Sequence, residues 1–315
     1  MIKNDKTKGF ILVILAALLW GYLGIPTKNL YDFNFDSFSV CFFRTSIAGI
    51  FYFLYCFKKD ANLLKIDKKG LLFFILYGAI GFATTFICYN VSVNYTSIAL
   101  GTMFMFTSQV WVVILSYFIF KEKFTSKKII AIFLTLAGSF MMCKMHGPKN
   151  LNLNLKGVIL GLISGITFAL QIIFAKISSK KYSQNTLLAY SFIFASLFLI
   201  PFMDAKNTLN ILSDTNNLYP IIQNIFVIGF FTTVIANGAY LKSVEHIEVG
   251  IASIIATLEI PIAAIIAYFV FHQTLDIIQI IGMFLIIISV IILELKIKNL
   301  SEVFNFSLSE KETYK

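Results

Sequence analysis

Residues 247–271 read IEVGIASIIATLEIPIAAIIAYFVF, and this stretch decides the class of the protein. Only Glu248 and Glu259 are charged among its 25 residues. A helix needs roughly 20 consecutive apolar residues to cross a bilayer, so the stretch is long enough to span one. A carboxylate inside such a span is costly, and intramembrane ionisable residues commonly mark functional sites.

Similar apolar stretches occur along the whole chain. Its 315 residues are 58% apolar and 13% charged, whereas an average globular protein has about twice this charged fraction. No polar stretch is long enough for a soluble catalytic domain, so a soluble enzyme, a secreted disulfide scaffold and a disordered chain are excluded. We predict an all-α polytopic membrane protein with ten transmembrane helices, at 9–27, 37–57, 70–93, 96–120, 128–145, 157–177, 186–203, 220–241, 247–271 and 275–295.

The basic residues indicate how these helices are oriented. An even number of spans places both termini on one side, and the segments of that side hold 20 of the 26 basic residues, against five on the other. Because basic loops stay on the cytoplasmic side, we predict a multi-pass protein of the cytoplasmic (inner) membrane with both termini in the cytoplasm. The cytoplasmic group is Lys3, Lys6, Lys8, Lys58, Lys59, Lys65, Lys68, Lys69, Lys121, Lys123, Lys127, Lys128, Lys176, Lys180, Lys181, Lys242, Lys296, Lys298, Lys311 and Lys315; the outer group is Lys28, Lys144, Lys149, Lys156 and Lys206.

An internal repeat organises the chain. We predict a cytoplasmic N-terminus at 1–8, five-helix repeats at 9–145 and 157–297, an outside connection at 146–156 and a cytoplasmic tail at 298–315. Because five is odd, the second repeat enters the membrane from the opposite side, so the repeats are inverted, an arrangement suited to alternating access. The matches that indicate the repeat include Lys8-Gly9 with Lys156-Gly157 at an offset of 148, and Tyr89 with Tyr240 and Tyr117-Phe118 with Tyr268-Phe269 at an offset of 151.

Several motifs resemble those of EamA-type proteins of the drug/metabolite transporter superfamily. The stretch 92–100 (SVNYTSIAL), followed by Gln109 and 118–123 (FIFKEK), is similar to the corner between the family's third and fourth helices. Its counterparts in the second repeat are 240–246 (YLKSVEH) and 258–261 (LEIP). The stretch 43–48 (FRTSIA) is similar to the Arg-Phe start of the family's second helix, and Trp20-Gly21 resembles the Trp-small pair of its first helix. The resemblance covers 9–297.

The chain departs from this family pattern at three places. Val110 stands where the family has a proline in the fourth helix, Lys121 stands where it has the glycine before Glu122, and His272-Gln273 replaces the second Gly-Glu pair. The resemblance implies transport of small metabolites, often amino acids or related compounds, across the inner membrane.

Two ionisable residues within the predicted spans are the main site candidates, since each costs about 2.5–3.5 kcal/mol on insertion scales. Glu259 lies near the middle of its span, and Pro261 cannot donate to the carbonyl of Thr257, so we expect a helix kink and a free acceptor there. Such a site suits a proton, a cation or a substrate ammonium group; the alternative is a structural carboxyl. Arg44, the only arginine of the chain, could hold a substrate carboxylate, pair with Glu259 or anchor its helix.

Polar amides and aromatic rings supply further pathway candidates. The amides could face a substrate path, although hydrogen bonds between helices are the commoner role. The aromatic rings could line a cavity or bind a cation, although Trp and Tyr near span ends usually form the interfacial belt. The amides are Gln109, Gln171 and Asn237, and the aromatic residues are Trp20, Tyr89, Trp111 and Tyr240.

The favoured function is a secondary transporter that exports or exchanges a small metabolite, not an enzyme. A lipid or amphiphile flippase is the nearest alternative; a membrane-embedded lipid-modifying enzyme and a non-transporting sensor are weaker ones. The sequence has no Walker A loop and no metal-binding spacing of histidines, so we expect no cofactor and no metal. The expected partners are a small-molecule substrate and the lipid bilayer, with no nucleic acid; substrate identity, coupling ion and oligomeric state are left open.

Overall fold

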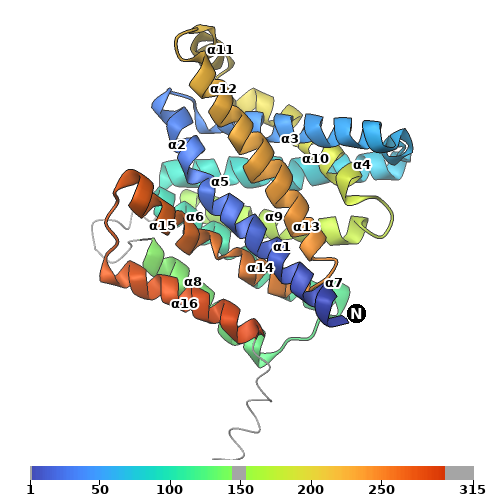
Figure 1. Cartoon of the computed structure of the whole chain (residues 1–315), viewed down its shortest axis with the longest axis vertical. Helices are drawn as coiled ribbons and strands as arrows, with labels where there is room; N and C mark the ends of the chain where they lie inside the picture. Colours follow the sequence, from blue (N-terminus) through green and yellow to red (C-terminus); the bar gives the residue numbers. More distant parts are fainter. Residues whose placement is uncertain (1, 144–153, 295–315) are drawn as a thin grey trace, which may run out of the picture.

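The computed structural model describes residues 2–143 and 154–294, and these are helical with no strand (Figure 1). The prediction of an all-helical protein is therefore confirmed. In chain order the elements are α1 (Ile2–Tyr22), α2 (Gly24–Asp32), α3 (Ser37–Lys59), η1 (Ala61–Leu64), α4 (Lys68–Leu76), η2 (Tyr77–Ala83), α5 (Thr84–Tyr95), α6 (Ile98–Phe106), α7 (Ser108–Phe120), α8 (Ser126–Met142), α9 (Leu155–Ser178), α10 (Gln184–Leu199), η3 (Ile200–Phe202), α11 (Ala205–Ser213), α12 (Leu218–Phe226), η4 (Val227–Ile235), α13 (Ala236–Ser243), α14 (Val249–Ala256), α15 (Glu259–Phe271) and α16 (Ile277–Glu294).

Eight helical segments within the described residues are long and apolar enough to cross a membrane. They are Lys6–Asp32, Ser37–Lys59, Lys68–Tyr95, Leu100–Phe120, Leu155–Ser178, Gln184–Phe202, Leu218–Ser243 and Val249–Phe271. The predicted spans 128–145 and 275–295 correspond to α8 and α16, helices of 17 and 18 residues. The ten-span count stays a prediction, and so do the connection 146–156 and the tail 298–315, because 144–153 and 295–315 lie outside the described residues.

One series of elements occurs twice along the chain. The first series is η2, α5, α6, α7 and α8, and the second is η4, α13, α14, α15 and α16. Corresponding elements begin 150 to 152 residues apart. Both η2 and η4 are π-helices, a rare form found frequently at functional sites. Both α7 and α15 end at a residue in the left-handed conformation, Lys121 (φ 56°) and His272 (φ 51°).

Helices far apart in the sequence pack through glycines. α3 lies against α10, where a Cβ added to Gly49 would come within 2.8 Å of the Ile193 nitrogen. α8 and α16 lie side by side along the lower edge of Figure 1. Their backbones approach at Gly138 and Gly282, and a buried hydrogen bond of 2.8 Å joins Thr135 and Ser289. Small residues allow such close approach in a membrane, where apolar burial provides little force between helices.

The connections of the described chain gather at two ends of the bundle. We call the end with the connections 60–67, 121–125, 179–183 and 244–248 the Glu122 end, and the other the opposite end. The four ion pairs that join described residues to one another all lie at the Glu122 end. The start of α1 lies there too, because Gly9 packs against His246 and Ile247.

Candidate functional site

A buried carboxylate organises the Glu122 end. Lys121 ends α7 in the left-handed conformation, and this turns the side chain of Glu122 towards the first residues of α14. The Glu122 carboxylate, 8% exposed, accepts hydrogen bonds from the backbone N–H groups of Val249 (2.9 Å) and Gly250 (3.3 Å). The N–H groups of a first helical turn have no partner within the helix and favour negative charge, so Glu122 completes α14 from another part of the chain.

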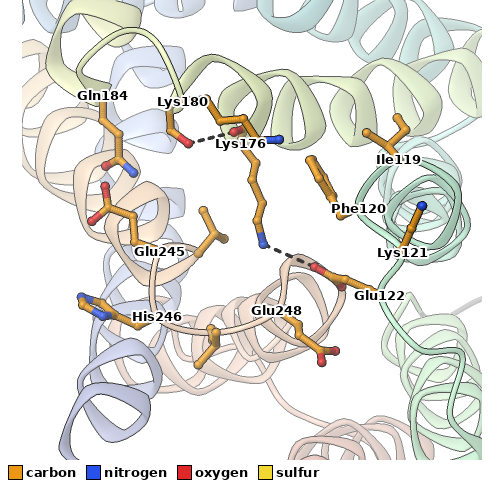
Figure 2. A pocket seen from close by; sticks show the side chains of 13 residues that line it. Ile119, Phe120, Lys121, Glu122, Lys176, Lys180, Gln184, Glu245, His246 and Glu248 are labelled. Atoms are coloured by element: carbon orange, nitrogen blue, oxygen red, sulfur yellow. Dashed lines mark hydrogen bonds and ion pairs between the residues drawn. The ribbon is translucent and has the colours of Figure 1, made fainter. Parts of the chain in front are cut away.

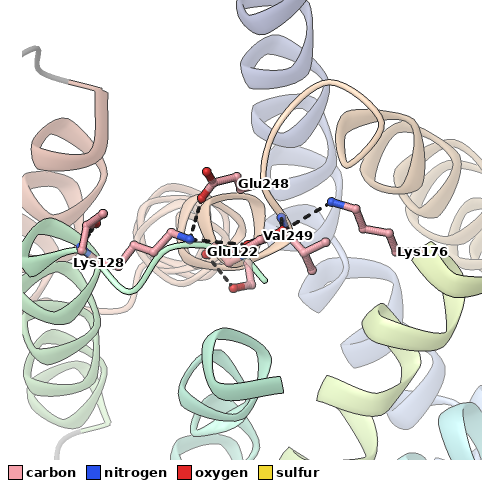
Figure 3. A network of polar contacts seen from close by, with 8 residues as sticks. Glu122, Lys128, Lys176, Glu248 and Val249 are labelled. Carbon is pink, nitrogen blue, oxygen red and sulfur yellow. Dashed lines mark hydrogen bonds and ion pairs between the residues drawn. The ribbon is translucent and has the colours of Figure 1, made fainter. Parts of the chain in front are cut away.

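Two lysines neutralise this carboxylate (Figure 3). Lys128, 3% exposed, lies 3.4 Å from Glu122 and 2.5 Å from the carboxylate of Glu248. Lys176, 27% exposed, lies 3.4 Å from the other oxygen of Glu122 and over the ring of Phe120. These residues, together with Val249 and Gly250, form what we call the Glu122 network, which ties α7 and α8 to α9 and α14.

A pocket of about 760 Å³ opens beside this network. Its lining comes from the end of α7, the end of α9, the start of α10 and the connection 244–248. Figure 2 shows Lys176 extending across the pocket towards Glu122, with Glu245 and His246 on the facing wall. The volume lies within the range typical of ligand pockets.

Four predicted pathway residues meet in a second, small pocket inside the bundle. Trp20, Gln171, Asn237 and Tyr240 all line it, together with Tyr77. The Trp20 and Tyr240 rings lie 5.3 Å apart. The free volume is about 20 Å³, which is room for about one water molecule. The structure thus brings together α1, α9, α13 and the first π-helix around two amides and five aromatic rings.

Polar groups around this central pocket differ in how they are satisfied. Asn237 donates to the Thr233 carbonyl in its own helix at 2.9 Å. The buried Tyr240 hydroxyl has no hydrogen-bond partner among the described residues. The Gln171 side chain is also buried. An unsatisfied buried hydroxyl costs free energy, so Tyr240 is available to a ligand or a water molecule.

Arg44 and Glu259 lie near each other, but no ion pair joins these two described residues. The Arg44 Nε–H donates to the Thr233 hydroxyl at 2.7 Å, and the guanidinium lies 5.5 Å from the centre of the Phe86 ring. Thr233 belongs to η4 and also donates to the Ile228 carbonyl, so Arg44 is anchored on the second π-helix. The predicted pairing of Arg44 with Glu259 is absent from this conformation and stays a prediction for another.

Glu259 is the first residue of α15, at a break between α14 and α15. It is half-buried, and its carboxylate makes no hydrogen bond or ion pair with another described residue. The N-terminus of α15 favours a negative charge at this position. Gly21 of α1 packs closely here, because a Cβ at Gly21 would lie 3.1 Å from the Glu259 carbonyl oxygen.

The prediction that the Thr257 carbonyl is a free acceptor is wrong. The helix is interrupted at Thr257-Leu258, before Pro261, and the Ile260 N–H turns back to donate to the Thr257 carbonyl at 3.0 Å. The Thr257 hydroxyl in turn donates to the Ile254 carbonyl at 2.6 Å. A tight turn therefore satisfies the acceptor that Pro261 cannot reach.

The remaining candidates lie apart from the central pocket. The Tyr89 hydroxyl is 3.1 Å from that of Thr102. Gln109 is buried, and its Oε1 has no hydrogen-bond partner within the described part of the chain; Trp111 packs half-buried against the core. Glu122 and Lys128 were not predicted as site residues, because Glu122 stands in a polar connection and Lys128, at the start of α8, was counted only as a cytoplasmic lysine. The place of Glu122 within the family-like stretch 118–123 was the available signal.

The chain is similar in sequence to known transporters. The EamA-like transporter family matches residues 7–143 and 155–295. An uncharacterised transporter of Haemophilus influenzae is 24% identical over 274 residues, covering 86% of each chain. An uncharacterised inner membrane transporter of Salmonella typhimurium is 22% identical over 297 residues, covering 93% of this chain and 97% of its own. These matches confirm the resemblance that the motifs predict.

The chain is also similar to a relative named after its substrate and to a solved structure. A riboflavin transporter of Fusobacterium nucleatum is 25% identical over 203 residues, covering 62% of this chain and 68% of its own. A crystal structure of a protein with 11% sequence identity matches with a TM-score of 0.75, covering 91% of this chain and 96% of that one. The second match shows a shared fold.

Proposed function

Because the chain belongs to the EamA-like transporter family, we propose that it is a secondary transporter of a small metabolite, working in the cytoplasmic membrane by alternating access. The proposed architecture is ten transmembrane helices in two inverted five-helix repeats, with both termini in the cytoplasm. On this assignment the Glu122 end faces the cytoplasm. The relatives named above are transporters, which supports transport over catalysis.

The observation that carries the mechanism is the pair of equivalent helix breaks. The first break, at Thr107, separates α6 from α7, and the second, at Thr257-Leu258, separates α14 from α15. In both, the threonine hydroxyl donates to the carbonyl three residues earlier, at 2.7 Å and 2.6 Å. Interrupted helices in corresponding parts of two repeats typically flank the substrate site of a transporter.

Glu259 and Arg44 are the proposed coupling and substrate groups. Glu259 stands at the second break as a half-buried carboxylate without a partner among the described residues, and this favours binding of a proton, a cation or an ammonium group. Arg44 keeps the other guanidinium nitrogens available while its Nε–H is engaged by Thr233, which favours a substrate carboxylate.

A planar heteroaromatic compound is the second substrate candidate, beside an amino acid or a related compound. The central pocket offers rings for stacking, Trp20 and Tyr240, and amides for hydrogen bonding, Gln171 and Asn237. The relative from Fusobacterium nucleatum is named a riboflavin transporter. Because the pocket has room for one water molecule in this conformation, a ring can enter only after the lining helices separate.

Transport by purified protein in liposomes tests this function. Vesicles loaded with single amino acids, amines or riboflavin would be assayed for exchange of the labelled solute, with and without a pH gradient. We expect at least one solute to exchange and Glu259→Gln to abolish its pH dependence. Asp32→Asn, at an exposed position at the end of α2, is the matched control. Absence of exchange for every solute would reject the function, and an unchanged pH dependence in Glu259→Gln would remove Glu259 from coupling.

A further inference from the structure

The two lysines of the Glu122 network differ in what they face. Lys128 is 3% exposed and does not line the large pocket, whereas Lys176 is 27% exposed and lines it. Figure 2 shows the Lys176 side chain reaching across the pocket, with its ammonium group at the Glu122 carboxylate. A solute in the pocket can therefore reach Lys176 but not Lys128.

The contact between Lys176 and Glu122 can be given up without leaving a buried charge alone. Its length of 3.4 Å is long for a charge-assisted hydrogen bond. Glu122 would keep Lys128 and the N–H groups of Val249 and Gly250. Breaking a buried pair is costly mainly when it strands an uncompensated charge, and that cost is absent here.

We propose that the pocket at the Glu122 end binds the carboxylate of a small solute, and that Lys176 exchanges Glu122 for this carboxylate. Lys176 and Lys180 stand on one wall, and Glu245 and Glu248 on the other. Glu248 is paired with Lys128, so the negative charge of Glu245 is what disfavours dianions on this wall. The ligand class is therefore a monocarboxylate, with or without an ammonium group. Phe120 supplies an apolar surface beside the lysine.

This exchange would loosen the tie between α9 and α7. The bound solute stabilises the state in which Lys176 has left Glu122, and a ligand shifts a conformational equilibrium only through such a difference in affinity. The pocket would then be an entry site whose occupation weakens the closure of its own end. That last role rests on the proposed function, whereas carboxylate binding does not.

Calorimetric titration of the full chain in nanodiscs of phosphatidylcholine tests the binding. The probes are sodium propionate and its uncharged isostere propionamide, at ionic strength matched with sodium chloride. We expect propionate to bind and propionamide not to bind. Lys176→Gln should weaken propionate binding at least tenfold, and Lys176→Arg should keep most of it. Lys180→Gln, which removes an exposed lysine of the same pocket, is the matched control and should change the affinity less than threefold.

The variant Glu122→Gln tests whether the solute carboxylate competes with Glu122 for Lys176 or is only attracted by the charge of Lys176. The amide oxygen can still accept from Val249, and Lys128 keeps Glu248, so the fold should persist, as thermal unfolding would verify. Removing the internal competitor for Lys176 should tighten propionate binding about tenfold, or 1.4 kcal/mol. Weaker or unchanged binding in this variant would overturn the exchange.

Three other results would overturn the site. They are equal binding of propionate and propionamide, equal losses in Lys176→Gln and Lys180→Gln, and displacement of propionate by phosphatidylglycerol in the nanodisc, which would assign the pocket to a lipid headgroup. Because no transport is measured, failure here leaves the proposed transporter function intact, and failure of exchange in liposomes leaves this binding result intact.

Discussion

The corner after α7 and the corner after α15 share a backbone and differ in charge. In both, a left-handed residue ends the helix, and the next N–H donates to a carbonyl six residues earlier, Glu122 to Ser116 and Gln273 to Ala267, each at 3.3 Å. Glu122 is a buried carboxylate held by two lysines. The uncharged Gln273 takes its place in the second series. The two corners therefore have the same backbone shape. The residue after the left-handed position, Glu122 or Gln273, determines whether ion pairs form there.

The residues around the two corners differ in the same sense. Lys128, at the start of α8, pairs with Glu122 and Glu248. The corresponding residue of α16, Gln279, donates to the Met142 carbonyl at 3.1 Å. Under alternating access, the ion pairs of the Glu122 network would add to the cost of opening the Glu122 end, so the resting conformation should favour closure of that end.

Removal of the Glu122 carboxylate should have the largest effect. Glu122→Ala leaves Lys128 without one of its carboxylates and Val249 and Gly250 without an acceptor, so we expect a loss of about 3–5 kcal/mol in unfolding free energy. Gln273→Ala, at the equivalent position, should cost less than about 1 kcal/mol. Equilibrium unfolding in mixed micelles measures both, and equal losses would contradict the asymmetry.

A charged pair built at the opposite corner should reduce the asymmetry. Gln273→Glu combined with Gln279→Lys reproduces the residue types of Glu122 and Lys128. We expect solute exchange in liposomes to slow about tenfold, which corresponds to 1.4 kcal/mol of added closure. Each single change is the control, and a double variant that exchanges solute at the wild-type rate would show that charge at the corner does not limit opening.

The two helix breaks allow a smaller test. Val110 and Pro261 are both the third residue of the helix after the break. The Val110 N–H donates to the Thr107 carbonyl at 3.0 Å, so Val110→Pro loses one hydrogen bond in a first turn, where proline is tolerated. We expect a loss of about 1 kcal/mol or less, read from thermal unfolding. Val113→Pro, three residues further into α7, should cost about 3 kcal/mol.

The smallest expected effect concerns Asp67 and its counterpart Asn217. Asp67 is the N-cap residue of α4 and accepts from Gly70, Tyr182 and Lys181. Asn217 stands at the N-cap of α12 but makes no capping hydrogen bond with its side chain. The hydrogen bond from the Tyr182 hydroxyl, and then that from Lys181, lowers the pKa of Asp67 below its ordinary value. Because the folded pKa is the lower one, the stabilisation is complete above the ordinary value near 3.9 and is lost as pH falls through the folded value.

Asp67→Asn should therefore lower the melting temperature by a constant small amount near neutral pH, and the difference from wild type should shrink below about pH 4. The pKa of Lys181 is raised by the Tyr182 and Asp67 hydrogen bonds, so its share of the stabilisation is present at neutral pH and is lost as pH rises through the raised value. Asn217→Ala should show no pH dependence of this kind. A difference for Asp67→Asn that stays constant down to pH 2 would contradict this assignment.

The sequence predicted the helical class and most of the spans, because an apolar segment of bilayer length is a local property. The segments around Glu259 and Arg44, predicted at 247–271 and 37–57, are examples, because both form long apolar helical segments in the structure. The π-helices were not predictable, because the shift to wider turns in η2 and η4 accompanies close packing of Gly78 and Gly229 on distant helices. Trp20, Gln171, Asn237 and Tyr240 were singled out one by one, but their meeting in one pocket depends on how three helices pack.

Lys128 shows why the charged corner escaped prediction. Counted as one of many cytoplasmic lysines, it contributes only to orientation, yet the structure buries it almost completely between two carboxylates. A lysine at the start of a helix carries no local sign of burial, because the carboxylate of Glu248 comes from 120 residues further along the chain. The error over the Thr257 carbonyl has a similar cause, since the turn that satisfies it starts before Pro261.

The contact between α8 and α16 constrains how the sequence can vary. A methyl group at Gly138 would come within 2.6 Å of the Gly282 carbonyl oxygen, and one at Gly282 within 2.7 Å of the Gly138 carbonyl oxygen. Neither glycine can therefore be replaced by a larger residue while the two helices keep this spacing. Among descendants of this gene the two glycines should be inherited as a linked pair, and larger side chains should arise at one site only where the helices have already moved apart.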